Sequence, residues 1–479
     1  MPAPARLSIA ENDDREVDVA GRGAGAVRTV RLGAGMAFWG DSVQPAIDMA
    51  TRGDIDYLCC DHLAELTMSI LSKQHTKNPA YGYTRDVVDL IRGVLPTCVA
   101  KGIKVVTNAG GANPEGCAER IAELAKELGL SGLRIAVVTG DDIRSSIDEF
   151  TAGGVSFANL DTGAELASVR DRLTHAAVYT GSEGIVEALD RGADVVVCGR
   201  VTDIALYLGP LIHEFGWSFD DWDRLGMATA VAHAVECGGQ ATGGLYDGGW
   251  PDVPGLETLG YPIAEVAEDG TALITKTPGS GGRVDIGTVS EQMIYEILDP
   301  ANYLTADVTA DFTGLRLEQL GPDVVRMTGA TGNPRPKTLK VNMGYRAGFV
   351  GEIVFTYTWP NAYAKAQRGL EFLRNRLARA NFRYDADRVE YLGQTSMWGS
   401  LVPDPTDPEL AEIVVRYAAR CPDETEARKV FTESVPLYNN GPAGVAGVGT
   451  RPPLKELFAI WPCLIPREHV VQSVELVEV

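Results

Sequence analysis

The stretch IKVVTNAGGANPEGCAERIAELAKELGLSGLRIAVVTG, residues 103–140, decides the fold. It passes from a β-branched segment through a glycine-rich turn into a helical pattern, and then into a second β-branched segment. Apolar strands that alternate with helices are typical of a parallel sheet covered on both faces. The unit recurs, with strands predicted at 27–33, 55–60, 103–110, 133–140, 176–181 and 193–199 and helices at about 42–52, 85–101, 115–129, 142–150, 183–191 and 203–215. An open sheet is favoured, although the strand count also allows a barrel.

The second half of the chain has a different pattern. Alternating polar and apolar residues predict antiparallel strands at 313–319, 323–329, 337–345 and 349–357, followed by a helix at about 361–380, a strand at 387–392 and a helix at 408–420. We therefore expect an α/β fold with a mostly parallel sheet, plus a smaller α+β domain. The predicted division is a flexible leader at 1–27, an α/β domain with the main pocket at 28–255 and an α+β domain at 256–479.

The composition excludes several classes of protein. A net charge of −22 repels phosphate backbones and anionic membranes, so a nucleic-acid partner is not expected. Charged residues interrupt every long apolar run, and the N-terminus lacks a signal-peptide pattern, so no membrane span or secretion is expected. The eight cysteines form no CxxC pair and no zinc spacing. They indicate reduced thiols in the cytoplasm and no metal site.

Polar and glycine residues follow the predicted strands. Ligands of open parallel sheets bind beyond the carboxyl ends of the strands. A pocket at this edge is therefore expected, although ordinary turn chemistry explains any one turn alone. The candidate residues are Asp61, His62 and Glu65 after strand two, Asn108, Gly110, Gly111 and Asn113 after strand three, Asp141 after strand four, Tyr179 after strand five, and Arg200 and Asp203 after strand six.

Two charged groups at this edge could carry chemistry. Arg200 could clamp a carboxylate, phosphate or thioester, or it could form an ion pair with Asp203 or Asp141 that ties two loops. Asp61 and Glu65 would share one face if their segment were helical, and paired carboxylates can divide into acid and base. They could equally be solvated residues at the start of a helix.

A third candidate is the segment HAVECGGQATGG, residues 233–244. In a helix over 221–237, His233, Glu236 and Cys237 lie on one face, and Gln240 and Thr242 fall in the loop beyond. A carboxylate beside an imidazole is suited to proton transfer. A polar last turn before a glycine also occurs for capping alone.

The glycine-rich loop in TPGSGGRVDIG, residues 277–287, is a fourth candidate. Exposed amides at Gly279, Ser280, Gly281 and Gly282, before a helix N-terminus, could bind a phosphate or another anion. A flexible turn between domains would have the same composition. The segment GAGMAFWG, residues 33–40, lacks the spacing of a dinucleotide fingerprint, and no P-loop pattern occurs, so no tightly bound cofactor is expected.

Several long segments resemble the acyclic terpene utilization AtuA family, over about residues 28–475. They are TNAGGANPEGCA, VVVCGRVTD, HAVECGGQATGG, TPGSGGRVDIGTVSEQMIYEILDPANYLTADVTADF, GATGNPRPKTLKV and WPCLIPREHV. The resemblance implies a setting of branched-acid and acyl-CoA catabolism, with a coenzyme A thioester as a possible substrate, but it brings no settled reaction. Many relatives carry a ferredoxin-like C-terminal extension with an SGDKG-type motif that this sequence lacks.

Three hypotheses follow. The first is a lyase or hydratase in which Glu236 is the base or acid, His233 tunes it, Arg200 holds the substrate's carboxylate or thioester, and Asn108 with Gly110 and Gly111 stabilises an oxyanion. The second is an acyl-CoA hydrolase or acyl transferase. Its nucleophile would be Cys237, Cys198 or Ser280, with His233 or His62 as base. The third is a non-catalytic subunit of an acyl-CoA-metabolising assembly. A homo-oligomer is expected from general frequency.

Overall fold

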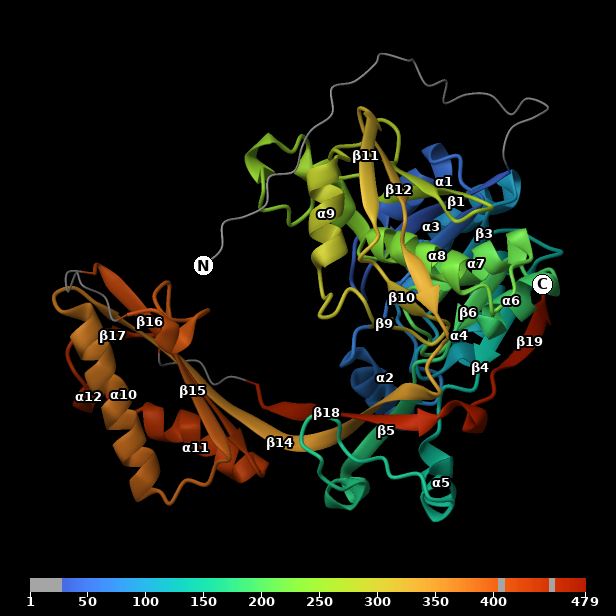
Figure 1. Cartoon of the computed structure of the whole chain (residues 1–479). Helices are drawn as coiled ribbons and strands as arrows, with labels where there is room; N and C mark the ends of the chain where they lie inside the picture. The colour runs from blue at the N-terminus through green and yellow to red at the C-terminus, as the bar shows by residue number, and fades with distance from the viewer. Residues whose placement is uncertain (1–27, 404–409, 448–452) are drawn as a thin grey trace.

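The computed structural model describes residues 28–403, 410–447 and 453–479, and the predicted leader lies outside this part of the chain. Five parallel strands form the centre of a ten-stranded sheet, in the order β1 (Thr29–Met36), β2 (Tyr57–Cys60), β3 (Lys104–Thr107), β6 (Val195–Cys198) and β4 (Arg134–Thr139) (Figure 1). The sheet is open, so the predicted α/β class is confirmed.

Helices cover both faces of this sheet, as the continuous apolar strands predict. The first face carries α1 (Gln44–Arg52), α3 (Val87–Lys101) and α4 (Pro114–Glu127). The second carries α6 (Glu183–Asp190), α7 (Ala205–Phe215) and α8 (Trp222–Glu236). Neighbouring residues of one strand face opposite cores, because Val105 packs with the first group and Val106 with the second.

The large sheet also takes strands from the second half of the chain. β7 (Pro262–Ala267), β8 (Ala272–Lys276), β12 (Val324–Thr328) and β11 (Arg316–Gly321) extend it beyond β1. β19 (Ser473–Glu478) pairs antiparallel with β4 at the other edge. The sheet is therefore mixed, and a division at residue 255 does not separate the two sheets.

The second sheet is organised around one strand of 21 residues, β14 (Thr338–Thr358). Its partners are β16 (Glu412–Cys421), β17 (Val445–Ala446), β18 (Lys455–Pro466) and β5 (Leu173–Val178), and β15 (Ala386–Leu392) pairs with β16. Helices α10 (Ala362–Arg379) and α11 (Glu424–Ser434) pack on its far half and form a separate lobe with its own core (Figure 1). Three short strands, β9 (Tyr303–Leu304), β10 (Thr309–Asp311) and β13 (Thr331–Asn333), form a third sheet.

Four local predictions were wrong. The segment 176–181 leaves the parallel sheet, because β6 pairs with both β3 and β4 and β5 pairs with β14. The predicted helix 408–420 overlaps strand β16, whose alternate residues are buried. The strands predicted at 337–345 and 349–357 are one strand with an irregularity between Arg346 and Gly348. Helix α2 (Thr67–Lys77) was missed, although Met68 and Leu71 pack against Ala177.

The contact between α8 and β13 depends on a glycine. A Cβ atom at Gly226 would lie 2.1 Å from the carbonyl oxygen of Thr331. Gly226→Ala is expected to lower the free energy of unfolding by about 1–3 kcal/mol. The clash outweighs the stabilisation that alanine would otherwise give through its higher helix propensity. Urea unfolding measures this. Gly321→Ala, where nothing lies within 4 Å of the new methyl group, is the matched control, and equal losses in both variants would contradict the packing argument.

Candidate active site

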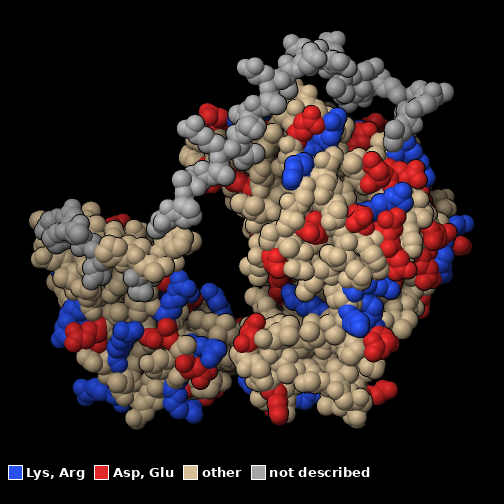
Figure 2. Space-filling view, viewed as in Figure 1, with Lys and Arg blue, Asp and Glu red and all other residues tan. Residues whose placement is uncertain are grey.

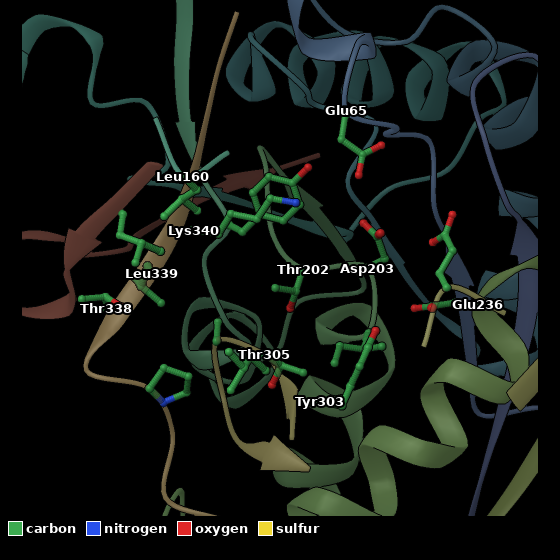
Figure 3. Close-up of a pocket in the computed structure, with 17 residues that line it drawn as sticks. Glu65, Leu160, Thr202, Asp203, Glu236, Tyr303, Thr305, Thr338, Leu339 and Lys340 are labelled. Carbon is green, nitrogen blue, oxygen red and sulfur yellow. The ribbon is translucent and has the colours of Figure 1, made fainter. Parts of the chain in front are cut away.

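A cavity of about 410 Å³ lies beyond the carboxyl ends of the parallel strands. Its walls come from the turns after β2, β5 and β6, from the end of α8, from residues 296–306 and from β14 and β18 (Figure 3). The size suits a small organic ligand. The lining residues are Glu65, Leu160, Tyr179, Thr202, Asp203, Ile204, Glu236, Glu296, Tyr303, Leu304, Thr305, Ala306, Pro336, Thr338, Leu339, Lys340 and Leu464.

The cavity has an acidic wall and an apolar wall. In Figure 3 the carboxylates of Glu65, Asp203 and Glu236 lie on one side, and Leu160 and Leu339 lie on the other. Glu65, Tyr179 and Asp203 were candidates from the strand-end argument and Glu236 from its helix spacing, and all four line this one cavity.

Glu236 and His233 form a buried pair at the end of α8. The Nδ1 atom of His233 lies 2.9 Å from Oε1 of Glu236, and both residues are buried. Within the described residues, neither Oε2 of Glu236 nor Nε2 of His233 has a hydrogen-bond partner. Burial raises the pKa of Glu236 above its ordinary value, against the lowering effect of His233. The arrangement holds one carboxylate oxygen at the imidazole and leaves the other available.

The fold fixes the position of this pair. The amide Nε2 of Gln292, on α9 (Ile286–Ile294), donates to the carbonyl oxygen of His233 over 2.7 Å. The imidazole packs against the rings of Tyr303 and Phe312, with centroid distances of 5.7 and 6.3 Å. Gly238 then adopts a φ of +57° and ends the helix. Contacts within the protein therefore fix the positions of the His233 and Glu236 side chains.

Arg200 is buried and lies outside the cavity lining. Its Nε atom donates to the carbonyl oxygen of Val201 over 2.8 Å, and Nη1 donates to that of Leu63 over 2.7 Å. Its Nη2 atom forms an ion pair with Asp203. The backbone amide of Arg200 donates to Asp141 over 2.9 Å. The ion pair with Asp203 lies within one loop, whereas the bonds to Leu63 and Asp141 tie this loop to two others. Each guanidinium nitrogen has an acceptor from the chain.

Asp203 and Asp61 lie beside this guanidinium and differ in position. Asp203 lines the cavity, and burial raises its pKa although Arg200 acts in the opposite direction. Asp61 lies before α2, in a loop rather than a helix, and accepts hydrogen bonds from the Asn108 amide over 2.6 Å and from the backbone of Leu63 over 3.0 Å. Burial raises the pKa of Asp61 as well. Asp61 and Glu65 are therefore not a helical pair.

Asn108, Gly110 and Asn113 have structural roles. Oδ1 of Asn108 accepts the backbone amide of His62 over 2.8 Å, so this side chain connects two strand ends. A Cβ at Gly110 would lie 2.5 Å from the carbonyl oxygen of Cys198, which explains the glycine by close approach. Asn113 caps α4 by accepting the amide of Gly116 over 3.1 Å. The structure places none of these three residues in the main cavity.

Gly111 and Asp141 line a second cavity, of about 250 Å³, together with Thr139 and His175. Burial raises the pKa of Asp141 to about 7. This cavity lies at the ends of β3 and β4, beside the point where β6 is inserted between them. The sequence candidates at this edge therefore line two different cavities among the described residues.

Amides of the glycine-rich loop at 277–283 are used in hydrogen bonds to the segment before β7. The amides of Gly281 and Gly282 donate to the carbonyl oxygens of Thr258 and Pro254 over 2.8 and 2.6 Å. Asp285 caps the following helix α9 with its own side chain. The loop, with Gly279 and Ser280, does not line the main cavity, and neither do Gln240 and Thr242, which form part of the short helix after α8.

The candidate nucleophiles lie away from a base. Burial raises the pKa of both Cys198 and Cys237, which keeps these thiols protonated. The hydroxyl of Ser280 donates to the carbonyl oxygen of Thr277 over 2.5 Å. His62 lies against Asp86, with its Nδ1 atom 3.4 Å from the carboxylate. The predicted nucleophile–base contact is not formed among these residues.

The sequence argument missed several lining residues. Glu296, Tyr303 and Thr305 lie in the segment that contains β9, and Lys340 lies on β14. None follows a parallel strand, so the strand-end argument did not reach them. These residues lie in two of the segments that carry the family resemblance, TPGSGG…TADF and GATGNPRPKTLKV. The resemblance was therefore the one signal in the sequence that pointed to them.

His175, in the second cavity, is expected to make the free energy of unfolding depend on pH. Burial lowers its pKa to about 4 from an ordinary value near 6.5. The unfolded chain therefore binds this proton first, and stability contributed by neutral His175 is lost as pH falls from about 6.5 towards 4, by up to about 3 kcal/mol. Denaturant unfolding of His175→Gln should show a smaller acid loss than the unaltered chain. A loss as large as that of His213→Gln, a surface control, would contradict this.

The fold and cavity define an α/β protein with a ligand-sized, carboxylate-lined pocket at the carboxyl edge of its parallel strands. The chain belongs to the family described as acyclic terpene utilisation family protein AtuA, which matches residues 30–476. No curated protein and no solved structure matches it. Within the described ranges, no cluster of three or more His, Cys, Asp or Glu residues suits a metal ion, and no helix is long and apolar enough to cross a membrane.

Proposed function

We propose that the protein is an enzyme of branched or terpenoid acid metabolism that adds water to, or removes water from, an acyl group. The observation that carries this proposal is the buried Glu236–His233 pair, whose Oε2 atom has no partner within the described chain and whose carboxylate lines the cavity. A raised carboxyl pKa brings the acid and base forms closer to equal population near neutral pH.

In hydration, Glu236 takes a proton from water as the water oxygen bonds to the β-carbon of an unsaturated acyl group. The same carboxylic acid then returns a proton to the α-carbon, so that the product differs from the substrate by one water. His233 holds Oε1 and directs Oε2 towards the reacting group. Dehydration is the reverse sequence.

The apolar wall suits a branched chain. Leu160, Leu339 and Leu464 lie along one side of the cavity, and Ile204 and Leu304 add to it. Burial of branched hydrocarbon against such side chains supplies about 25 cal/mol per Å² of apolar surface. The acyl part of the substrate, either a free acid or a coenzyme A thioester, would lie here. The family description, acyclic terpene utilisation, supports a substrate of this shape.

A nucleophilic hydrolase receives less support, because desolvation raises the pKa of the Cys198 and Cys237 thiols and keeps them protonated. A mass-spectrometric assay separates the possibilities. Purified protein is incubated with saturated, enoyl and 3-hydroxy esters of coenzyme A, branched and straight, and with the free acids. We expect a gain or loss of one water from a branched unsaturated or hydroxy compound. Release of coenzyme A would favour the hydrolase, and no change in any compound would contradict an enzymatic role on these substrates.

A further inference from the structure

Lys340 occupies a distinctive position in the main cavity. Of the described residues that line it, Lys340 alone carries a positive charge, whereas Glu65, Asp203, Glu236 and Glu296 are acidic. Its ammonium group lies 4.7 Å from the ring centre of Tyr179. Across the described ranges, no carboxylate forms an ion pair with it, although lysine ammonium groups elsewhere in the chain, such as that of Lys73, have carboxylate partners.

The two cations near Tyr179 differ in availability. The guanidinium of Arg200 lies 4.2 Å from the same ring centre, but its nitrogens are bound to Val201, Leu63 and Asp203. Arg200 therefore holds the cavity wall, while Lys340 presents its charge to the cavity. The hydroxyl of Thr202, also in the wall, is buried without a hydrogen-bond partner in the described part of the chain.

We propose that Lys340 binds a carboxylate of the substrate, so that the protein acts on acyclic branched acids that carry a free carboxylate. This inference rests on the proposed function, since it names a chemical group on the substrate of the same cavity. In Figure 3, the Lys340 side chain starts on the side of Leu160 and Leu339 and extends its ammonium group into the middle of the cavity. A carboxylate at the acidic wall would be repelled by like charges, so the charge distribution fixes one orientation of the ligand.

The orientation has a chemical consequence. With the carboxylate at Lys340, the chain of the ligand has Leu160 and Leu339 on one side and Glu236 on the other. Lys340 is therefore a specificity-determining residue: it selects the anionic end of the ligand, and Glu236 acts on the chain.

Equilibrium binding tests the inference without any turnover. Isothermal titration calorimetry at neutral pH compares citronellic acid with citronellol, which has the same branched chain and no charge. The unaltered protein is expected to bind the acid at least about tenfold more tightly, as a charge-assisted hydrogen bond allows. Lys340→Met is expected to reduce this preference to less than about twofold and to leave the affinity for the alcohol unchanged.

Lys337→Met is the matched control, because Lys337 lies close in sequence but outside the cavity lining, and it should keep the preference for the acid. Equal binding of acid and alcohol by the unaltered protein, no binding of the acid, or a preference that survives in Lys340→Met would overturn the inference. The proposed function fails separately, through normal turnover in Glu236→Gln or through the absence of any water-adding or water-removing reaction.

Discussion

Replacement of Glu236 by glutamine is expected to lower the turnover number by about two to four orders of magnitude, the usual contribution of a positioned general base. Glutamine keeps the size of the side chain and can accept a hydrogen bond from His233, but it cannot take a proton from water. The same base makes the rate depend on pH. Because burial raises the pKa of Glu236, the rate of hydration should fall with decreasing pH at a higher pH than an exposed glutamate would give.

Two measurements make this prediction specific. Glu318→Gln, a change at an exposed glutamate that pairs with Arg326 on the outer strands, should leave turnover unchanged. The thermal midpoint of Glu236→Gln should stay close to that of the unaltered protein or rise slightly, since the change removes a buried ionisable group. Turnover at the normal rate in Glu236→Gln would remove Glu236 from the mechanism.

Replacement of Arg200 by methionine is expected to lower the free energy of unfolding by about 3–5 kcal/mol. The change leaves the carbonyl oxygens of Leu63 and Val201 without their donor and leaves Asp203 and Asp61 without the nearby positive charge. A buried charge that loses its partner lowers the free energy of unfolding far more than a broken ion pair at the surface does. Urea unfolding followed by circular dichroism measures the difference.

The control for Arg200 is an arginine in an exposed pair. Arg335 pairs with Glu183, and both side chains are far more exposed than that of Arg200, so Arg335→Met should lower the free energy of unfolding by less than about 1 kcal/mol. The double variant Arg200→Met with Asp203→Asn should recover part of the loss, because it removes one uncompensated carboxylate. Equal losses in Arg200→Met and Arg335→Met would show that the buried network does not stabilise the fold as described.

The sequence predicted those parts of the fold that depend on short stretches of neighbouring residues. A parallel strand such as β3 is apolar throughout and is followed by a turn and a helix, so its class and place are readable within forty residues. Sheet membership is not local. β11, β12 and β19 have the same alternation whether they extend the large sheet or form a second one, and β16 combines an arginine and alanine-rich run with a strand pattern that was mistaken for a helix.

The candidate site divides in the same way. Glu65, Tyr179 and Asp203 were reachable because residues after parallel strands meet at one edge, and Glu236 because its helix spacing was visible. Lys340 and Tyr303 come from elements that reach this edge only through tertiary packing. Arg200 shows a further limit: a strand-end arginine has the same sequence whether its guanidinium faces a ligand or, as here, three acceptors of its own chain.

The surface carries many acidic side chains, as the excess of acidic over basic residues in the composition predicts. In Figure 2 acidic side chains gather on the right of the larger body, and acidic and basic side chains lie close together on the smaller lobe at the left. Ion pairs on the surface include Arg92–Glu127 and Arg120–Glu123. Surface pairs of this kind contribute little to stability.

The most direct test of the account follows oxygen from water into the product. The branched unsaturated compound that reacts in the mass-spectrometric assay is incubated with the protein in water labelled with heavy oxygen. The account predicts that one labelled oxygen appears at the β-carbon of the product with the unaltered protein, and that Glu236→Gln incorporates it at least about a hundredfold more slowly. Product formation without label, or incorporation at the same rate in Glu236→Gln, would contradict the account.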